Sequence, residues 1–96
     1  LPTSTILVID ANEHHPWWDP GCKKTSQGGQ PLADWIEDQN LSLLNTPGAT
    51  TFFRPNMSRE TTLDLTIATL DLVDKVEDWQ TTTETGSDHH GILFSI

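Results

Sequence analysis

An uninterrupted run of aliphatic and β-branched residues at positions 5–9 limits the fold of this chain more than any other feature. Such a run is typical of a strand that is buried on both faces, and it ends abruptly at the charged residue Asp10. We therefore expect Asp10 at the end of a buried strand, where the sites of α/β proteins are commonly built.

Patterns typical of strands, loops and helices alternate along the rest of the chain. Residues 11–30 hold too many prolines and glycines for regular structure, and a loop of this length is usually functional or disordered. Residues 62–67 alternate strictly between polar and apolar, which turns Asp64 away from the apolar layer, toward solvent or a site. Helices are also predicted at residues 31–39 and 70–76, a loop at 54–60, and strands at 41–45, 50–53, 77–83 and 91–96.

This order of elements predicts an α/β fold, in which a mostly antiparallel or mixed sheet of about five to six strands carries one main helix and a short second helix. With 96 residues, the chain forms one domain at most. Asn40 is suited to end the main helix, and Pro31 to its first turn. Trp35 and Trp79 are expected in packing roles, whereas Trp17 and Trp18 are divided evenly between packing and base stacking.

Composition excludes several classes of protein. Lys and Arg number 5 against 14 Asp and Glu, so the net charge of -9 opposes simple attraction to nucleic acid unless metal ions or a basic segment offset it. The single cysteine, Cys22, excludes an intramolecular disulfide and fits a reducing, intracellular compartment. No apolar run approaches the roughly 18 residues that span a bilayer, so no membrane partner is expected.

Three polar clusters follow or precede the predicted strands: Asp10-x-Asn12, Asp64, and Ser87-Asp88-His89. Hydrolysis of a phosphodiester needs a general base, a carboxylate that orients it, hard oxygen ligands for a divalent cation and a donor to the phosphate. The side chains of these clusters can supply this set.

The same clusters carry a resemblance to a known family. Residues 9–18, Ile-Asp-Ala-Asn-Glu-His-His-Pro-Trp-Trp, resemble the Gly-Asp-Phe-Asn motif and His-His-Pro-x-Trp extension of apurinic-endonuclease-like domains from non-LTR retrotransposon polyproteins. These domains belong to the endonuclease/exonuclease/phosphatase superfamily. The resemblance continues through residues 35–36, 40–48, 61–66 and 86–92 in the family's order. Ile9 and Ala11 depart from it, because the family has Gly and Phe there.

This resemblance implies a metal-dependent DNA endonuclease that nicks phosphodiesters with Mg²⁺ or Mn²⁺. Residues 1–96 would be the C-terminal half of such a domain, and thus one half of a four-layered α/β sandwich. The family's N-terminal half supplies a metal-binding Glu, a phosphate-contacting Asn and a second sheet, and no such segment precedes Thr5. We therefore expect an incomplete enzyme with an exposed apolar sheet face, which the missing half or self-association covers.

The resemblance also assigns roles to single residues. His89 would activate water or contact the scissile phosphate, and Asp64 would hold its imidazole in the useful tautomer. Asp88 would lie at the Mg²⁺ site, Asn12 would bind a phosphate oxygen, and Asp10 would assist the nucleophile or leaving group.

The resemblance extends to the DNA substrate. The hairpin loop before the Asp64 strand would read the DNA groove, which makes Arg54 and Arg59 candidate DNA contacts. We expect a nuclear location when the protein acts on chromosomal DNA.

Other interpretations remain open. The chain can be a non-catalytic fragment that self-associates or binds another protein, which its acidity favours, or a phosphatase with the same fold and Ser-Asp-His site. Asp10 and Asn12 are also suited to an ordinary Asx turn, Asp64 to a solvated strand face, and the two arginines to plain loop charges. Adjacent histidines such as His14 and His15 point apart, which disfavours a zinc site.

Overall fold

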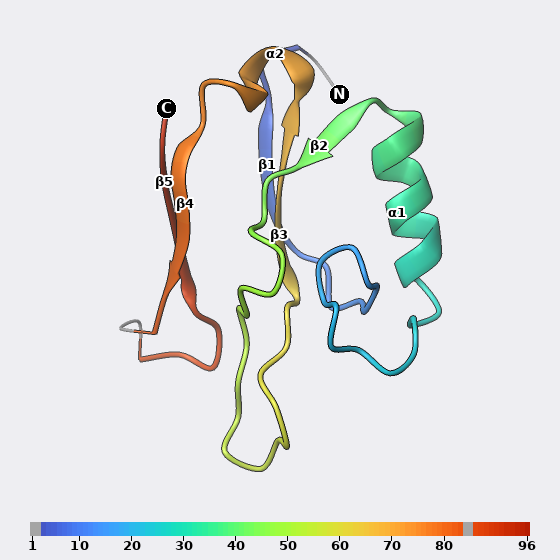
Figure 1. Cartoon of the computed structure of the whole chain (residues 1–96), viewed down its shortest axis with the longest axis vertical. Coiled ribbons are helices and arrows are strands. Elements are labelled where there is room, and N and C mark those ends of the chain that lie inside the picture. Colours follow the sequence, from blue (N-terminus) through green and yellow to red (C-terminus); the bar gives the residue numbers. More distant parts are fainter. Residues whose placement is uncertain (1–2, 84–85) are drawn as a thin grey trace.

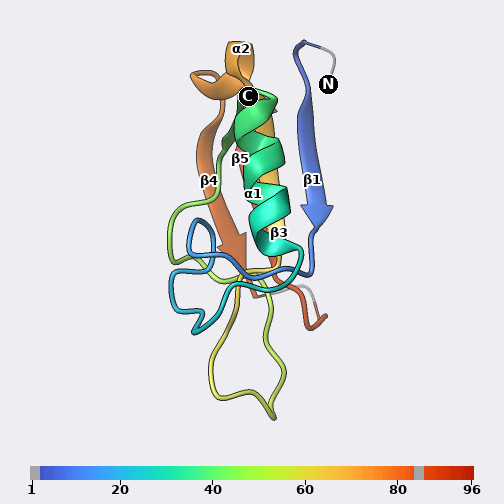
Figure 2. The ribbon, with the colours of Figure 1, turned by 90° about the vertical axis from the view of Figure 1, so that its right-hand side faces the viewer.

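The computed structural model of this protein describes residues 3–83 and 86–96, which form three layers. A sheet in the order β1-β3-β2 lies in the middle, helix α1 covers one of its faces, and a second sheet of β4 and β5 covers the other (Figures 1 and 2). The elements are β1 Ile6–Asp10, α1 Gly29–Asp38, β2 Leu41–Leu43, β3 Asp64–Thr69, α2 Leu70–Val73, β4 Glu77–Thr82 and β5 Gly91–Ser95. No helix within the described residues is long and apolar enough to cross a membrane.

The strands confirm the predicted α/β class but form two sheets in place of one. Every strand pair is antiparallel: β1 and β2 flank β3, and β4 pairs with β5. The short helix α2 connects β3 to β4, so the chain turns away from the first sheet and starts a separate two-stranded layer (Figure 1).

The central strand β3 is buried on both faces. Leu65 and Ile67 point to the layer of α1, as the alternation predicts. The prediction that Asp64 faces solvent or a site does not extend to its neighbours on the polar face, Thr62 and Thr66, which are both buried. The second sheet covers this face, and the Trp79 indole Nε1 donates a hydrogen bond to Thr66 Oγ1 at 3.1 Å.

The core lies between β3 and α1, and its largest side chain comes from a loop. Trp18 is fully buried against Ile36 of α1 and Leu65 of β3. Its Nε1 donates to the Glu13 carbonyl oxygen at 2.9 Å, so the polar end of the ring is satisfied. Trp35, which the sequence placed in a packing role, is an exposed large side chain of α1. The irregular loop between β1 and α1 is thus ordered and contributes to the core.

Helix α1 begins two residues before the predicted start, at Gly29. Glycine is required at this position by close packing, since a Cβ at Gly29 would come within 2.2 Å of the His14 carbonyl oxygen. Pro31 lies in the first turn as predicted. Asn40 follows the helix with φ 54°, a left-handed conformation that asparagine tolerates, and ends it as predicted.

The predicted strand at residues 50–53 is only an isolated bridge. Phe52 pairs with Thr61 on one side and with His89 on the other. His90 N–H donates to the Thr51 carbonyl oxygen, and Phe53 N–H to that of Asp88. This segment therefore holds the loop before β5 against the chain that leads into β3. The predicted helix at residues 70–76 also ends early, at Val73.

Candidate active site

Three segments far apart in the sequence meet at one end of the sheets. Asp10 is the last residue of β1, Asp64 is the first residue of β3, and the two are register partners in adjacent strands. His89 lies in the loop that precedes β5. These are the lower ends of β1 and β3 in Figure 1, at the level of the long loop between β1 and α1, while the loop that leads into β3 extends further down. The register of β1 and β3 brings Asp10 and Asp64 together, and the bridge between Phe52 and His89 holds the third residue beside them.

The geometry of this group fixes the orientation of the imidazole. His89 Nδ1 lies 2.8 Å from Asp64 Oδ2, and His89 Nε2 lies 3.6 Å from Asp10 Oδ2. A carboxylate oxygen accepts hydrogen bonds, so this geometry fits the tautomer in which the Nδ1–H group donates a hydrogen bond to Asp64. The Phe52 ring packs edge-on against the imidazole, with the ring centroids 4.7 Å apart. In the tautomer with the proton on Nδ1, the lone pair of the imidazole is on Nε2, the nitrogen that faces Asp10.

The same three residues form a candidate metal site. Asp10, Asp64 and His89 each offer a ligand atom, and these atoms lie within 4.8 Å of one another. Two carboxylates in one group supply the hard oxygen ligands that divalent cations such as Mg²⁺ and Mn²⁺ prefer. The Asp10 side chain is 54% exposed, so a cation can reach it from solvent.

Asn12 adjoins this group through a turn. Its backbone N–H donates to Asp10 Oδ1 at 3.1 Å, and its φ is 49°. This is an Asx-type arrangement, and it also keeps Asn12 directly beside the Asp10 carboxylate. The Asx turn and the expected phosphate contact are therefore compatible at Asn12.

Asp88 lies outside the Asp10, Asp64 and His89 group. Its Oδ2 accepts a hydrogen bond from Arg54 Nε at 3.0 Å, and the Arg54 guanidinium lies 5.2 Å from the centroid of the Phe52 ring. Both members of this ion pair are at least half exposed, so it contributes little to stability and can open.

Arg59 is held in an ion pair that the sequence did not indicate. Its Nη1 and Nη2 donate to the two carboxylate oxygens of Asp19 at 2.9 and 3.2 Å, and His14 Nδ1 lies 2.8 Å from Asp19 Oδ2. Burial by itself raises the pKa of Asp19. The hydrogen bonds from Arg59 and His14 outweigh burial, and the pKa ends below its ordinary value.

Asp19 thus ties the loop after β1 to the loop before β3. The sequence signal was poor, since Asp19 stands among the prolines and glycines of an irregular loop. His15 stacks on Trp18 with ring centroids 5.1 Å apart. His14 and His15 therefore have pairing and packing roles in this loop.

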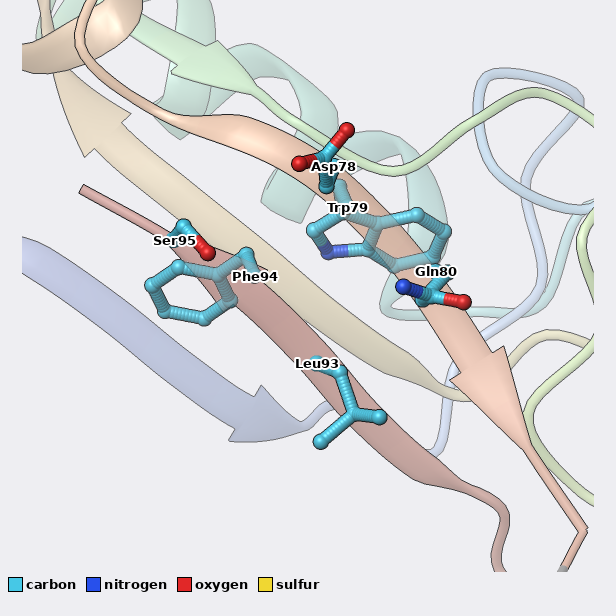
Figure 3. Close-up of a pocket in the computed structure, with 6 residues that line it drawn as sticks. All are labelled: Asp78, Trp79, Gln80, Leu93, Phe94 and Ser95. Atoms are coloured by element: carbon cyan, nitrogen blue, oxygen red, sulfur yellow. The ribbon is translucent and has the colours of Figure 1, made fainter.

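One surface depression lies apart from these groups. It measures about 600 Å³ and lies on the second sheet, where Figure 3 shows the side chains that line it on β4 and β5. The lining residues are Asp78, Trp79, Gln80, Leu93, Phe94 and Ser95. None of them belongs to the Asp10, Asp64 and His89 group.

Comparison with known proteins identifies the family of this chain. A family model described as endonuclease-reverse transcriptase matches residues 1–93. The match covers nearly all of the chain, and the protein therefore belongs to this family. No curated protein matches the chain.

A solved structure is similar as well. It is described as the endonuclease domain of TRAS1, a telomere-specific non-LTR retrotransposon, and it matches with 30% sequence identity and a TM-score of 0.81. The alignment covers 95% of this chain and 42% of the other, so this chain spans less than half the length of the structure it matches. The similarity supports a nuclease function in general.

Proposed function

We propose that this protein is the C-terminal half of a metal-dependent endonuclease domain that nicks DNA. The observation that carries the proposal is the Asp64, His89 and Asp10 group, in which one imidazole lies between two carboxylates at 2.8 and 3.6 Å. In such a group one carboxylate, here Asp64, orients the histidine, and the other, here Asp10, acts near the reacting atoms.

The residues of the chain have distinct roles in this proposal. Asp64 keeps the proton of His89 on Nδ1, so that Nε2 accepts the proton of the attacking water. The water oxygen bonds to phosphorus as the bond to the leaving sugar oxygen breaks. Asp10, 3.6 Å from Nε2, assists the water or the leaving oxygen, and Asn12 binds a phosphate oxygen. Preorganised groups of this kind lower the barrier because they need no reorientation during the reaction.

The proposed cofactor is Mg²⁺ or Mn²⁺. The donor set fits such an ion, because Asp10 and Asp64 supply two carboxylates in one group. Asp10 would hold the ion, and Asp88 would join once its exposed ion pair with Arg54 opens. When bound, the ion neutralises charge on the phosphate and polarises its P–O bonds.

DNA is the proposed substrate. Arg54 is the more available candidate contact, because its ion pair with Asp88 is exposed, whereas Arg59 would have to exchange a buried carboxylate for a phosphate. A net charge of -9 means that the metal ion and additional positive charge from outside these residues must support DNA binding. A nuclear location follows if the target is chromosomal DNA.

The proposal also places the chain within a larger fold. Residues 1–96 would form half of a four-layered α/β sandwich, and an N-terminal half would be the principal partner. The exposed face of the central sheet supports this, because Val8 on β1 is 52% exposed and apolar. The second sheet covers β3 and leaves this side of β1 open.

A second candidate function is a non-catalytic module that self-associates or binds another protein. The same exposed Val8, together with Leu93 on β5, favours it, since apolar side chains on strands are suited to burial against a partner. This module would form stable oligomers and would not nick DNA.

Nicking of supercoiled plasmid separates the two candidates. The protein is incubated with plasmid and Mg²⁺ or Mn²⁺, with and without EDTA and with and without the N-terminal half of a related domain. Nicking that EDTA abolishes, with or without the added half, is the expected result. A folded oligomer that stays inactive under all conditions would contradict the endonuclease proposal and favour the module.

A second experiment tests the metal site without activity. Paramagnetic Mn²⁺ at substoichiometric concentration should broaden the NMR signals of His89 strongly. The signals of His14, whose carboxylate partner is already paired with Arg59, serve as the internal control. Equal broadening at the two histidines would mean that the ion binds without preference for the proposed site.

A further inference from the structure

Asn45 is a buried polar residue that the proposed chemistry does not use. It follows β2, is 7% exposed, and turns its carboxamide toward β3. Its Nδ2 donates to the Asp64 carbonyl oxygen at 2.9 Å, and its Oδ1 accepts from Thr66 N–H at 2.8 Å. In a regular sheet these two bonds would come from the backbone of a neighbouring strand. The side chain of Asn45 therefore substitutes for a peptide group.

This substitution occurs where strand pairing stops. Leu43 is the last residue of β2 with a register partner in β3, and Leu44 N–H still donates to the Thr66 carbonyl oxygen at 2.8 Å. Beyond that point the backbone leaves the sheet, and the Asn45 carboxamide extends the ladder as far as Asp64. The first residue of β3 thus has no backbone partner from β2.

The N–H group of Asp64 is also held by a side chain. It donates to Thr51 Oγ1 at 3.0 Å, and Thr51 is fully buried. Two buried side chains, Asn45 and Thr51, therefore fix the backbone of Asp64 on this side. Asp64 is the residue whose carboxylate holds His89, so any shift of its backbone changes the aspartate–histidine geometry directly.

We infer that Asn45 is a positioning residue, which holds the backbone of Asp64 so that its carboxylate stays on His89 Nδ1. It touches neither His89 nor Asp10, and it acts through Asp64. Without the carboxamide, the Asp64 carbonyl and the Thr66 N–H would be left unpaired in a buried place, and the start of β3 would move to find other partners. The consequence for catalysis rests on the proposed function, whereas the consequence for the tautomer of His89 does not.

The first test reads the tautomer of His89 by ¹⁵N NMR of its ring nitrogens. Asn45→Asp keeps the shape and the acceptor for Thr66, but it replaces the donor with an oxygen that faces the Asp64 carbonyl. Asn45→Ala removes both groups. We expect the proton on Nδ1 in the unmodified protein and a mixture of both tautomers in either variant. A folded variant that keeps the proton on Nδ1 would overturn the inference.

Ile36→Val is the matched control, because Ile36 is a buried apolar side chain of the core between α1 and β3. It loosens packing without touching the Asp64 backbone, so its tautomer should match the unmodified protein. A measurement on the unmodified protein covers the case in which both Asn45 variants fail to fold. A scalar coupling across the hydrogen bond from Asn45 Nδ2 to the Asp64 carbonyl carbon is expected, and its absence would overturn the inference.

The second test uses plasmid nicking. Misplacement of a catalytic group by about 1 Å can cost on the order of 100-fold, so we expect Asn45→Asp to lower kcat about 10- to 100-fold with KM nearly unchanged. Ile36→Val should leave both values within about twofold. An unchanged kcat in folded Asn45→Asp would overturn the role of Asn45. Inactivity of the unmodified protein, both alone and with the added N-terminal half, would count against the proposed function, and the tautomer would still decide the role of Asn45.

Discussion

Two aspartate–histidine pairs in this protein have the same hydrogen-bond distance and different surroundings. In both pairs histidine Nδ1 lies 2.8 Å from an aspartate Oδ2. The Asp19 side chain is 3% exposed, and Arg59 donates to both of its oxygens. The Asp64 side chain is 14% exposed, and the other nitrogen of His89 faces a second carboxylate, that of Asp10.

The two pairs therefore differ in the charge of a third side chain, which is Arg59 beside Asp19 and Asp10 beside His89. Beside Asp19 it is a cation, which balances the buried carboxylate and closes the cluster. Beside Asp64 it is another anion, which leaves excess negative charge next to a basic nitrogen at a partly exposed position. Excess negative charge attracts a divalent cation, whereas a balanced pair gains nothing from one. A short aspartate–histidine distance alone does not identify a catalytic pair.

The largest expected difference between the pairs is in catalysis. His89→Ala should lower the nicking rate about 10²- to 10⁴-fold, because it removes the proposed general base. His14→Ala should leave the rate within a few-fold after correction for the folded fraction. Plasmid nicking of the two variants at equal concentration gives the comparison. Similar losses in both would remove the proposed distinction between the pairs.

The Asp19 pair should have the larger effect on stability. Arg59→Met leaves the buried Asp19 carboxylate with His14 as its remaining charged partner, and we expect a loss of about 2–3 kcal/mol in unfolding free energy. Urea unfolding monitored by tryptophan fluorescence measures it. An unchanged midpoint would show that the ion pair does not hold the two loops together. A loss of nicking beyond the loss of folded protein would instead mark Arg59 as a DNA contact.

Acid should weaken the Asp19 pair in a defined direction. The folded-state pKa of Asp19 lies below the ordinary value, so its stabilisation is complete above about pH 4 and is lost as pH falls through the lowered pKa. Urea unfolding from neutral to acid pH should therefore show a steeper loss in the unmodified protein than in Arg59→Met.

The Asp71 carboxylate also contributes to the loss of stability in acid, and it serves as an internal reference. The Ser4 hydroxyl hydrogen bond, followed by that of Thr69, lowers the pKa of Asp71 to about 2. Because this contribution is common to both proteins, the difference between their pH profiles isolates Asp19. Parallel profiles would mean that Arg59 does not set the pKa of Asp19.

The smallest effect on stability is expected at the exposed ion pair. Arg54→Met breaks the bond to Asp88, and its unfolding free energy should change by less than about 1 kcal/mol, because both partners are largely solvated. Its effect on nicking is the informative one. Weaker DNA binding with unchanged stability is expected if Arg54 contacts the phosphate backbone, and unchanged binding would assign it to an ordinary loop charge.

The sequence predicted the parts of the site that depend on local pattern. The apolar run at residues 5–9 ends at Asp10, and the alternation at residues 62–67 turns Asp64 away from the α1 layer, as the structure has them. The association of Asp64 with His89 came from the resemblance and not from spacing. The structure agrees with it, while the catalytic roles remain predictions.

Other features had no signal in the pattern. Asp19 stands in an irregular loop, and Asn45 follows a strand as many asparagines do, so nothing marked either as a buried contact. The division into two sheets was missed for a similar reason, since every strand carries the same periodicity whichever sheet it joins. Trp18 was assigned no preference between packing and stacking, and only the fold of the loop shows that it fills the core.

The sequence by itself determined where β1, β3 and α1 form and which side of β3 faces the helix, because periodicity, proline and asparagine act over a few neighbouring residues. Only the tertiary structure decided which charges are paired and which stay open. Asn45 bonds to a residue 19 positions away, and Arg59 to one 40 positions away. Such contacts depend on how whole segments pack. An aspartate paired with a histidine has a structural role beside a cation, as at Asp19, and a proposed reactive role beside another carboxylate, as at Asp64.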